Sequence, residues 1–383
     1  MLPNQRMKFK NKIWRKMKLG EIVNINMGQS PRSEFYNSRG EGMPFYQGVT
    51  DFGEKYPKKS TYCSRPTKIA EVGDIFFSVR APVGDVNVAI GKSCIGRGVA
   101  ALRMKNGNND FLYFFLKNYE RYFKGISGGT TYESINKDQL EDIEFIIPSD
   151  LNEQKRIAFI LSAFDDKIEL NNKISRTLEQ TAQAIFKEWF VKFKFSGHEK
   201  VKIVDSELGK IPEGWQVKNI LEIVKRISVG KKYENETALP KGNVPILDQG
   251  QSGRIGFHNS EPGVIASLDE PVVVFTNHTC NYWLITYPFS AIQNVLPYVG
   301  INGYSTLFVY YLTCGKIKMQ GYKGHWPEFE QQEFVIPPQK LAEEYSVIIK
   351  PIIKKIVEVE NENQKLAALR DLLLPKLMSG EIV

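Results

Sequence analysis

The stretch LNEQKRIAFILSAFDDKIELNNKISRTLEQTAQAIFKEWF, residues 151–190, decides the fold of this chain. Its apolar positions recur every seven residues in two sets four residues apart, a pattern typical of a helix that packs lengthwise against another helix. One set is Ile157, Phe164, Asn171, Leu178 and Ile185, and the other is Leu161, Ile168, Ser175, Ala182 and Trp189. We therefore expect a long coiled-coil helix within residues 151–195.

Residues 341–383 carry the same seven-residue pattern. Its two sets are Tyr345, Ile352, Val359, Leu366 and Leu373, and Ile349, Ile356, Asn363, Arg370 and Leu377. An antiparallel pairing with Asn171 opposite Asn363 aligns the apolar layers along both helices. The imperfect layers are Phe164 opposite Arg370 and Ser175 opposite Val359. A buried asparagine fixes the register, because a slipped partner leaves its amide unpaired. We predict that Asn171 and Asn363 set this register; the alternative is that each helix packs only on its own domain.

Four landmarks occur twice in the same order and indicate an internal repeat. They are the segments opened by Trp14 and Trp215, FLYFFLKN at 111–118 and LFVYYLTC at 307–314, FIIP at 145–148 and FVIP at 334–337, and the long helix that follows each. The expected fold is α+β, with two pseudo-repeated mixed α/β globular domains separated by a long antiparallel two-helix coiled coil. The expected segments are a first domain at 1–150, a helix at 151–195, a linker at 196–205, a second domain at 206–340 and a helix at 341–383.

Composition narrows the possible partners. The 383 residues are 42% hydrophobic and 12% aromatic, which is enough for packed cores, and the net charge of +8 favours an anionic partner such as nucleic acid. Cations outnumber anions in residues 1–150, whereas the two balance in 206–340, so a second DNA-binding domain would depend more on neutral donors. The four cysteines form no C-x-x-C pair, and we expect neither a signal peptide nor a membrane span, which favours a cytoplasmic protein.

At this point the chain resembles the specificity subunits of type I restriction–modification systems. The resemblance rests on residues 151–190, on LRDLLLPKLMSGEI at the end of the chain, on GKIPEGW before the second domain, and on SVRAPVGDVNVA and CIGRGVAAL in the first. It implies that each domain is a target-recognition domain for one half of a split double-stranded DNA site, and that the helices set the gap. It also implies that two methyltransferase subunits dock on the helices and that restriction translocase subunits can join them.

Catalytic and cofactor motifs are not evident in the sequence. There is no Asn/Asp-Pro-Pro-Tyr-type loop, and Gly84 to Gly91-Lys92-Ser93 has the wrong spacing for a phosphate-binding loop. His278 and Cys280 have no second pair with metal-ligand spacing. We expect no catalytic residue, no cofactor and no metal.

Sequence readers use arginine on guanine, asparagine or glutamine on adenine, and basic or hydroxyl groups on phosphate. Two donor-rich loops precede the FIIP and FVIP segments at one framework position, and they are the most favoured candidates. For Arg80 a structural salt bridge is an equal alternative. The candidate DNA-binding residues are Tyr46, Gln47, Arg80, Arg97, Thr130, Thr131 and Lys137 in the first domain, and Gln249, Asn277, His278, Asn294, Tyr322, Lys323, His325 and Trp326 in the second.

Two other functions fit the same features. One is an orphan specificity-like adaptor that binds DNA without a methyltransferase. The other is a scaffold that binds proteins through its coiled coil. A salt-dependent affinity for DNA distinguishes both DNA-binding hypotheses from the scaffold.

Overall fold

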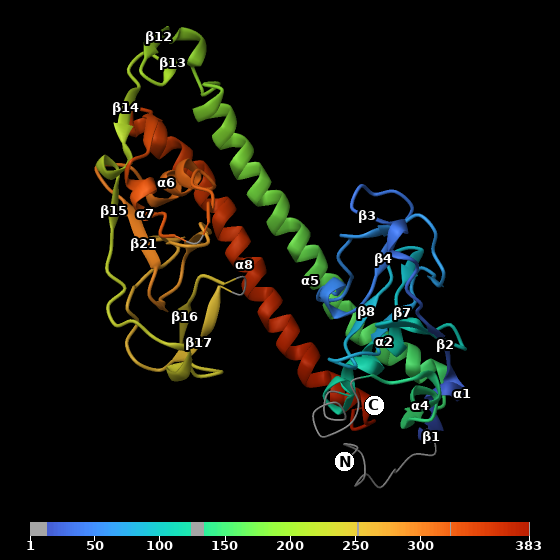
Figure 1. Ribbon diagram of the computed structural model, residues 1–383. Helices are drawn as coiled ribbons and strands as arrows, with labels where there is room; N and C mark the ends of the chain where they lie inside the picture. The colour runs from blue at the N-terminus through green and yellow to red at the C-terminus, as the bar shows by residue number, and fades with distance from the viewer. Residues whose placement is uncertain (1–13, 124–133, 251–252, 322, 383) are drawn as a thin grey trace. The chain divides into compact units, whose positions relative to one another are not determined.

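The computed structural model describes residues 14–123, 134–250, 253–321 and 323–382, and the chain divides into two compact units. Unit 1 comprises residues 1–169 and 363–383, and unit 2 comprises residues 170–362. Both unit boundaries fall inside long helices, α5 (Leu151–Phe186) and α8 (Gln339–Met378), so each helix contributes to both units (Figure 1). The predicted domain limits treat the helices as separate segments and stay a prediction.

Unit 1 is built on two sheets and a framework strand pair. The four-stranded sheet has the order β2 (Val23–Met27), β10 (Val99–Met104), β7 (Ile75–Ser78), β8 (Val86–Val88). The five-stranded sheet has the order β3 (Tyr36–Asn37), β5 (Tyr62–Cys63), β4 (Met43–Tyr46), β9 (Ser93–Ile95), β6 (Ile69–Ala70). The framework pair is β1 (Trp14–Lys18) with β11 (Glu144–Pro148), and the shorter helices are α1 (Leu19–Ile22), α2 (Asn109–Asn118) and α4 (Lys137–Glu141). The aromatic side chains of α2 are buried in the core.

Unit 2 repeats this plan. Its four-stranded sheet has the order β15 (Val224–Arg226), β21 (Val295–Gly300), β18 (Val272–Thr276), β19 (Tyr282–Ile285). A three-stranded sheet has the order β17 (Arg254–His258), β16 (Val244–Leu247), β20 (Ser290–Ala291). The framework pair is β14 (Gln216–Asn219) with β22 (Glu333–Ile336), and the shorter helices are α6 (Thr306–Thr313) and α7 (Trp326–Glu330).

The strand pairing explains why the landmarks repeat. In unit 1 the segment after Trp14 pairs with FIIP, so that Met17 lies opposite Phe145; in unit 2 Lys218 lies opposite Phe334. In both units the central four-stranded sheet is entirely antiparallel and has the same strand order. The predicted duplication is confirmed.

The two long helices run antiparallel within each unit. In unit 1 Ile157 and Leu161 of α5 share a buried core with Leu377 and Met378 of α8. In unit 2 the Tyr345 hydroxyl of α8 donates to the Ala182 carbonyl of α5 at 3.2 Å. Every residue of the four predicted seven-residue sets is buried or partly buried. The antiparallel helix pair predicted from the periodicity is confirmed.

The polar, glycine-rich stretch after α5 is more ordered than a plain linker. It forms a hairpin of β12 (Ile203–Ser206) and β13 (Gly209–Pro212), and Ile211 is buried in the core of unit 2. Glycine at position 209 has a φ of +99°, which this tight turn requires and which other residues rarely adopt. Over the residues that the structure describes, no helix has the length and apolarity needed to cross a membrane.

Candidate nucleic-acid interface

Backbone contacts bring the described candidates of the first domain onto one surface. Gly96 N donates to Tyr46 O at 2.8 Å, and Val79 N donates to Gly98 O at 3.0 Å. A Cβ at position 98 would lie 2.2 Å from Gln47 O, so only glycine permits this close approach. Gln47 and Arg97 therefore lie beside the end of β7, where Arg80 follows.

The segment before α4 completes this surface. Ile135 N donates to Val79 O at 2.9 Å, and Arg80 forms a β-bridge with Ser134. Lys137 is the first residue of α4 and pairs with Glu141 at 3.4 Å. The side chains of Gln47, Arg80, Arg97 and Lys137 are all exposed, and we call these four residues the first surface.

Tyr46 does not belong to the first surface, although the sequence made it a candidate. Its side chain is 1% exposed, and its ring packs on Phe76 with the centroids 5.3 Å apart. Burial raises the pKa of its hydroxyl to about 12. Tyr46 is therefore a core residue. Thr130 and Thr131 lie outside the described residues.

The candidates of the second domain are joined by direct hydrogen bonds at the end of β18. His278 N donates to Gln249 Oε1 at 2.9 Å, and Asn277 N donates to the Asn294 carbonyl at the same distance. Asn294 has a φ of +67°, a left-handed conformation that asparagine tolerates better than most residues.

The segment before α7 packs against the same strand end. His325 N donates to Asn277 O, and Trp326 N donates to Asn277 Oδ1, both at 2.9 Å. His278 Nδ1 lies 2.9 Å from Lys323 O. We call Gln249, Asn277, His278, Asn294 and Lys323 the second surface; all five are exposed or partly exposed.

His325 and Trp326 are buried, contrary to their proposed role as DNA contacts. His325 is 0% exposed and its Nδ1 lies 3.0 Å from Glu328 Oε2, while Trp326 stacks on Phe329 with the ring centroids 4.8 Å apart. Both side chains support the loop from beneath. Tyr322 lies outside the described residues.

The two surfaces occupy equivalent places. Each lies where the third strand of the central sheet ends, β7 or β18, beside the segment that precedes the short helix α4 or α7. The hydrogen bond from Ile135 N to Val79 O corresponds to that from His325 N to Asn277 O. The prediction that two donor-rich loops share one framework position stays a prediction, because most of the first loop lies outside the described residues.

The two surfaces differ in charge. The first presents Arg80, Arg97 and Lys137, whereas in the second Glu328 forms an ion pair with Lys323 and a hydrogen bond with His325. The hydrogen bond from Lys323 is the main cause that lowers the pKa of Glu328, and His325 adds to it. The second surface therefore offers mainly neutral amides and an imidazole.

Sequence reasoning missed the residues that support these surfaces. Ser30 Oγ accepts from Arg97 N at 3.2 Å, which places the segment around Ser30 beside the first surface. Glu328 was also missed, although its spacing of three residues from His325 on a short helix was visible in the sequence. Among the residues that the structure describes, no three His, Cys, Asp or Glu side chains converge as a metal site.

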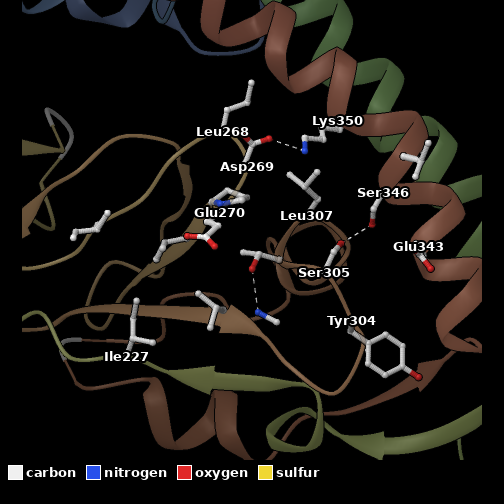
Figure 2. A pocket seen from close by; sticks show the side chains of 17 residues that line it. Ile227, Leu268, Asp269, Glu270, Tyr304, Ser305, Leu307, Glu343, Ser346 and Lys350 are labelled. Atoms are coloured by element: carbon white, nitrogen blue, oxygen red, sulfur yellow. Dashed lines mark hydrogen bonds and ion pairs between the residues drawn. The ribbon is translucent and has the colours of Figure 1, made fainter.

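A separate cavity of about 520 Å³ lies between the central sheet of unit 2 and the early turns of α8. Figure 2 shows the Lys350–Asp269 ion pair, at 2.8 Å, and the Ser305–Ser346 hydrogen bond, at 2.5 Å, among its lining residues. None of the candidate DNA-binding residues lines it. The cavity therefore belongs to the attachment of the domain to α8 rather than to the second surface.

The chain thus contains two copies of a β-rich domain, each with a polar surface at the equivalent strand end, and a pair of long helices. This is the arrangement of a subunit with two binding domains. Comparison with known proteins shows what the chain is similar to. Residues 11–180 match the family model described as the type I restriction modification DNA specificity domain. The type I restriction enzyme MjaIX specificity subunit of Methanocaldococcus jannaschii is 27% identical over 97% of this chain and 94% of its own length.

Two further relatives support this. The putative MjaX specificity subunit of the same organism is 39% identical, but the alignment spans only 46% of this chain and 45% of that protein. The crystal structure of the type I restriction–modification S subunit from M. genitalium matches with a TM-score of 0.61 at 19% identity, over 97% of this chain and 98% of that chain, which shows the shared fold. The chain is thus similar to the specificity subunits of type I restriction enzymes, through the family model over residues 11–180 and through the MjaIX subunit over nearly its whole length.

Proposed function

We propose that this chain reads a split double-stranded DNA target, with the first domain reading one half-site and the second domain the other. The observation that carries the proposal is the pair of equivalent donor-bearing surfaces at the ends of β7 and β18. Arginine, glutamine, asparagine and lysine are the side chains that pair with base edges and phosphates in the grooves of DNA. The match of residues 11–180 to the DNA specificity domain, and the likeness of nearly the whole chain to a type I specificity subunit, support the assignment of these surfaces to DNA.

The proposal extends to partners. Two methyltransferase subunits would dock on the helical region formed by α5 and α8, and restriction translocase subunits would join the complex. The name of the family, which joins restriction and modification, supports this. The chain itself would bring these enzymes to the target, in the cytoplasm where the DNA is.

Selection of bound duplexes from a random library, by the chain in complex with its methyltransferase, tests the proposal. We expect one bipartite motif with an unspecified gap, and methylation at that motif in cells. Arg80→Ala should lower affinity and relax base preference in one half only. A lost base contact costs about 1–3 kcal/mol, or roughly 5- to 150-fold in affinity.

Lys92→Gln is the matched control, because Lys92 is an exposed cation that pairs with Glu71 beyond the opposite end of β7. It should leave both half-sites unchanged. Lys323→Gln should weaken the contribution of the other domain and leave the first half-site intact. If Arg80→Ala and Lys323→Gln alter the same half, or if the folded complex selects no motif, the two-surface assignment is wrong.

The orphan adaptor and the scaffold give different results. An adaptor would bind the bipartite motif without a methyltransferase in the complex. A scaffold would show no salt-dependent affinity for DNA, whereas a protein that contacts several phosphates loses affinity steeply as salt rises.

A further inference from the structure

A buried carboxylate in unit 1 joins three separate parts of the chain. The Asp165 side chain, on α5, is only 5% exposed. Its Oδ1 accepts from Arg370 NH1 of α8 at 2.7 Å, and its Oδ2 lies 3.2 Å from Lys55 Nζ of the first domain. One carboxylate thus holds a cation from the second long helix and a cation from the DNA-reading domain, and we call these three residues the triad.

Lys55 is itself fixed to the sheet of the first domain. Its carbonyl accepts from Val88 N at 2.8 Å, at the end of β8. Two residues earlier, Gly53 exchanges two hydrogen bonds with the buried Asn87 side chain, at 2.9 and 3.0 Å. A shift of Asp165 relative to Lys55 would therefore displace the backbone bonded to β8 and not only the Lys55 side chain.

The same loop leads to the first surface. Lys58 N donates to Asp51 O at 2.8 Å, and Asp51 Oδ2 accepts from Gln47 N at 2.6 Å. Gln47, a candidate base-reading residue, is thus joined through this loop to the segment that carries Lys55. The triad therefore holds the end of this loop that carries Lys55, and the other end of the loop carries Gln47 at the proposed DNA site.

The charges of the triad favour one orientation of the first domain relative to the two long helices. Burial is the largest single effect on Lys55 and opposes its charge, but Asp165, Tyr56 and Asp166 together outweigh it and the pKa of Lys55 is raised. Arg370 also binds Asp371 Oδ1 at 2.9 Å, so the two cations face two carboxylates. A buried charge that loses its partner is strongly destabilised, so few relative orientations of domain and helices satisfy all members.

Apolar packing alone would not impose that geometry. Ile157 and Leu161 attach the first domain to α5 through the core of unit 1, and apolar contact is non-directional. Asp165 lies one helical turn beyond Leu161, and its charge-assisted hydrogen bond is directional. The core supplies the attachment and the triad adds a constraint on rotation about it.

Unit 2 attaches its domain by other means. Phe186, Phe308 and Tyr345 form an aromatic contact between α5, α6 and α8. The ion pair that reaches α8 from the domain, Lys350 with Asp269, has side chains 48% and 81% exposed, and such pairs contribute little. Among the residues that the structure describes, a domain is joined to both long helices through one buried carboxylate only in unit 1.

We propose that Asp165, Lys55 and Arg370 are positioning residues that fix the orientation of the first domain on the helix pair, and thereby the gap accepted between the two half-sites. This rests on the proposed function, since it assumes that the first domain reads one half-site. The triad does not touch DNA and should not affect which bases are read.

The test measures orientation and gap separately. A spin-label pair, one label at the exposed Val72 of the first domain and one at the exposed Lys155 of α5, reports orientation by its distance distribution in the full chain. Cys280→Ser and Cys314→Ser remove the two partly exposed thiols beforehand. Asp165→Asn keeps the side-chain size and should broaden the distribution, while Arg370→Lys, which keeps the charge, should broaden it less.

The gap is then read by selecting DNA with fixed half-sites and variable spacing, using the complex with the methyltransferase. In Asp165→Asn, the preference for the best gap over gaps one base pair longer or shorter should fall by about tenfold, a coupling typical of a broken buried pair. The half-site sequences should not change. Arg156→Gln breaks the Glu153–Arg156 pair on the same helix and is the control that should leave both readouts unchanged.

Each outcome decides a separate point. A folded Asp165→Asn chain with an unbroadened distance distribution refutes the triad as a positioning element, whatever the DNA result. A broadened distribution with an unchanged gap preference refutes its role in spacing. A wild-type complex that selects no bipartite motif refutes the proposed function, and the distance measurement still decides whether the triad fixes orientation.

Discussion

The Asn171–Glu362 hydrogen bond gives a quantitative prediction about the helix pair. Asn171 is fully buried, and its Nδ2 donates to Glu362 Oε2 at 2.8 Å. A hydrogen bond to a charged group contributes about 1.5–3 kcal/mol. Asn171→Leu removes this donor from a partly buried carboxylate, so we expect a loss of roughly 1–3 kcal/mol in the free energy of unfolding, reduced by the apolar surface that leucine buries.

A double-mutant cycle isolates the pair. Glu362→Leu should also destabilise the chain, and the combination with Asn171→Leu should be less damaging than the sum of the two single changes by about 1–3 kcal/mol. Gln180→Leu is the control, because Gln180 is an exposed amide on the same helix and its change should stay within about 0.5 kcal/mol of the wild type. Urea unfolding followed by tryptophan fluorescence suits the measurement, since four of the five tryptophans lie within residues 170–362.

The same cycle also tests the partner predicted from the sequence. That prediction placed Asn363 opposite Asn171, and it stays a prediction; the structure places the adjacent Glu362 carboxylate on the Asn171 amide. We expect a larger coupling energy for Asn171 with Glu362 than with Asn363. If Asn171→Leu and Glu362→Leu add to within about 0.3–0.5 kcal/mol, the hydrogen bond does not stabilise the helix pair and the reasoning fails.

Three further predictions follow from the helices, the duplication and the thiols. One heptad inserted after Leu178 and another before Ile356 should lengthen the gap between the half-sites by about three base pairs. The reason is that seven helical residues span about 10 Å and B-DNA rises ~3.4 Å per base pair. An unchanged gap in a folded, DNA-binding protein would show that the length of the helices does not set the gap. Exchange of residues 206–340 for the equivalent domain of a relative should change one half of the methylated motif, and a change in both halves would contradict two independent domains. Burial raises the pKa of Cys94 to about 11 and, less strongly, that of the partly exposed Cys280, so the thiolates are scarce near neutral pH and alkylation should speed up as pH rises. Mass spectrometry should show Cys280 modified before Cys94 and protected by target DNA, because it lies beside the second surface; a footprint that DNA leaves unchanged would place the contact elsewhere.

The helices and the duplication could be predicted because their signals are local and periodic. The spacing of residues such as Ile157 and Leu161 along the helix indicates which face of the helix is buried. The equivalence of Met17–Phe145 and Lys218–Phe334 was likewise present as a repeated motif, although the sequence did not show that the repeated segments pair with each other.

Side-chain burial in loops could not be predicted in this way. Tyr46 and His325 are residue types that often contact DNA, but their exposure depends on contacts far along the chain, such as Tyr46 O with Gly96 N. Arg370 appeared as an imperfect layer opposite Phe164. The structure shows instead that it turns to Asp165, beside Phe164, and Lys55 completes the charge pairing from a domain for which no periodicity argument applies.

The chemistry of the two surfaces implies that their residues are not equally replaceable. In the first surface Arg80 follows β7 and Arg97 lies in a glycine-flanked turn, and the hydrogen bonds that hold Gln47, Arg80 and Arg97 use the backbone atoms of these residues. In the second, the side-chain oxygens of Gln249 and Asn277 accept backbone hydrogen bonds from His278 and Trp326. Removing an acceptor that holds a partly buried amide costs about 1–3 kcal/mol, whereas an exposed side chain can be changed within about 0.5 kcal/mol. A new base preference can therefore arise in the first domain by single substitutions that leave the fold unaffected. In the second domain the groups that would read DNA also hold the loop in place. A change of specificity there therefore requires several residues of the loop to change together.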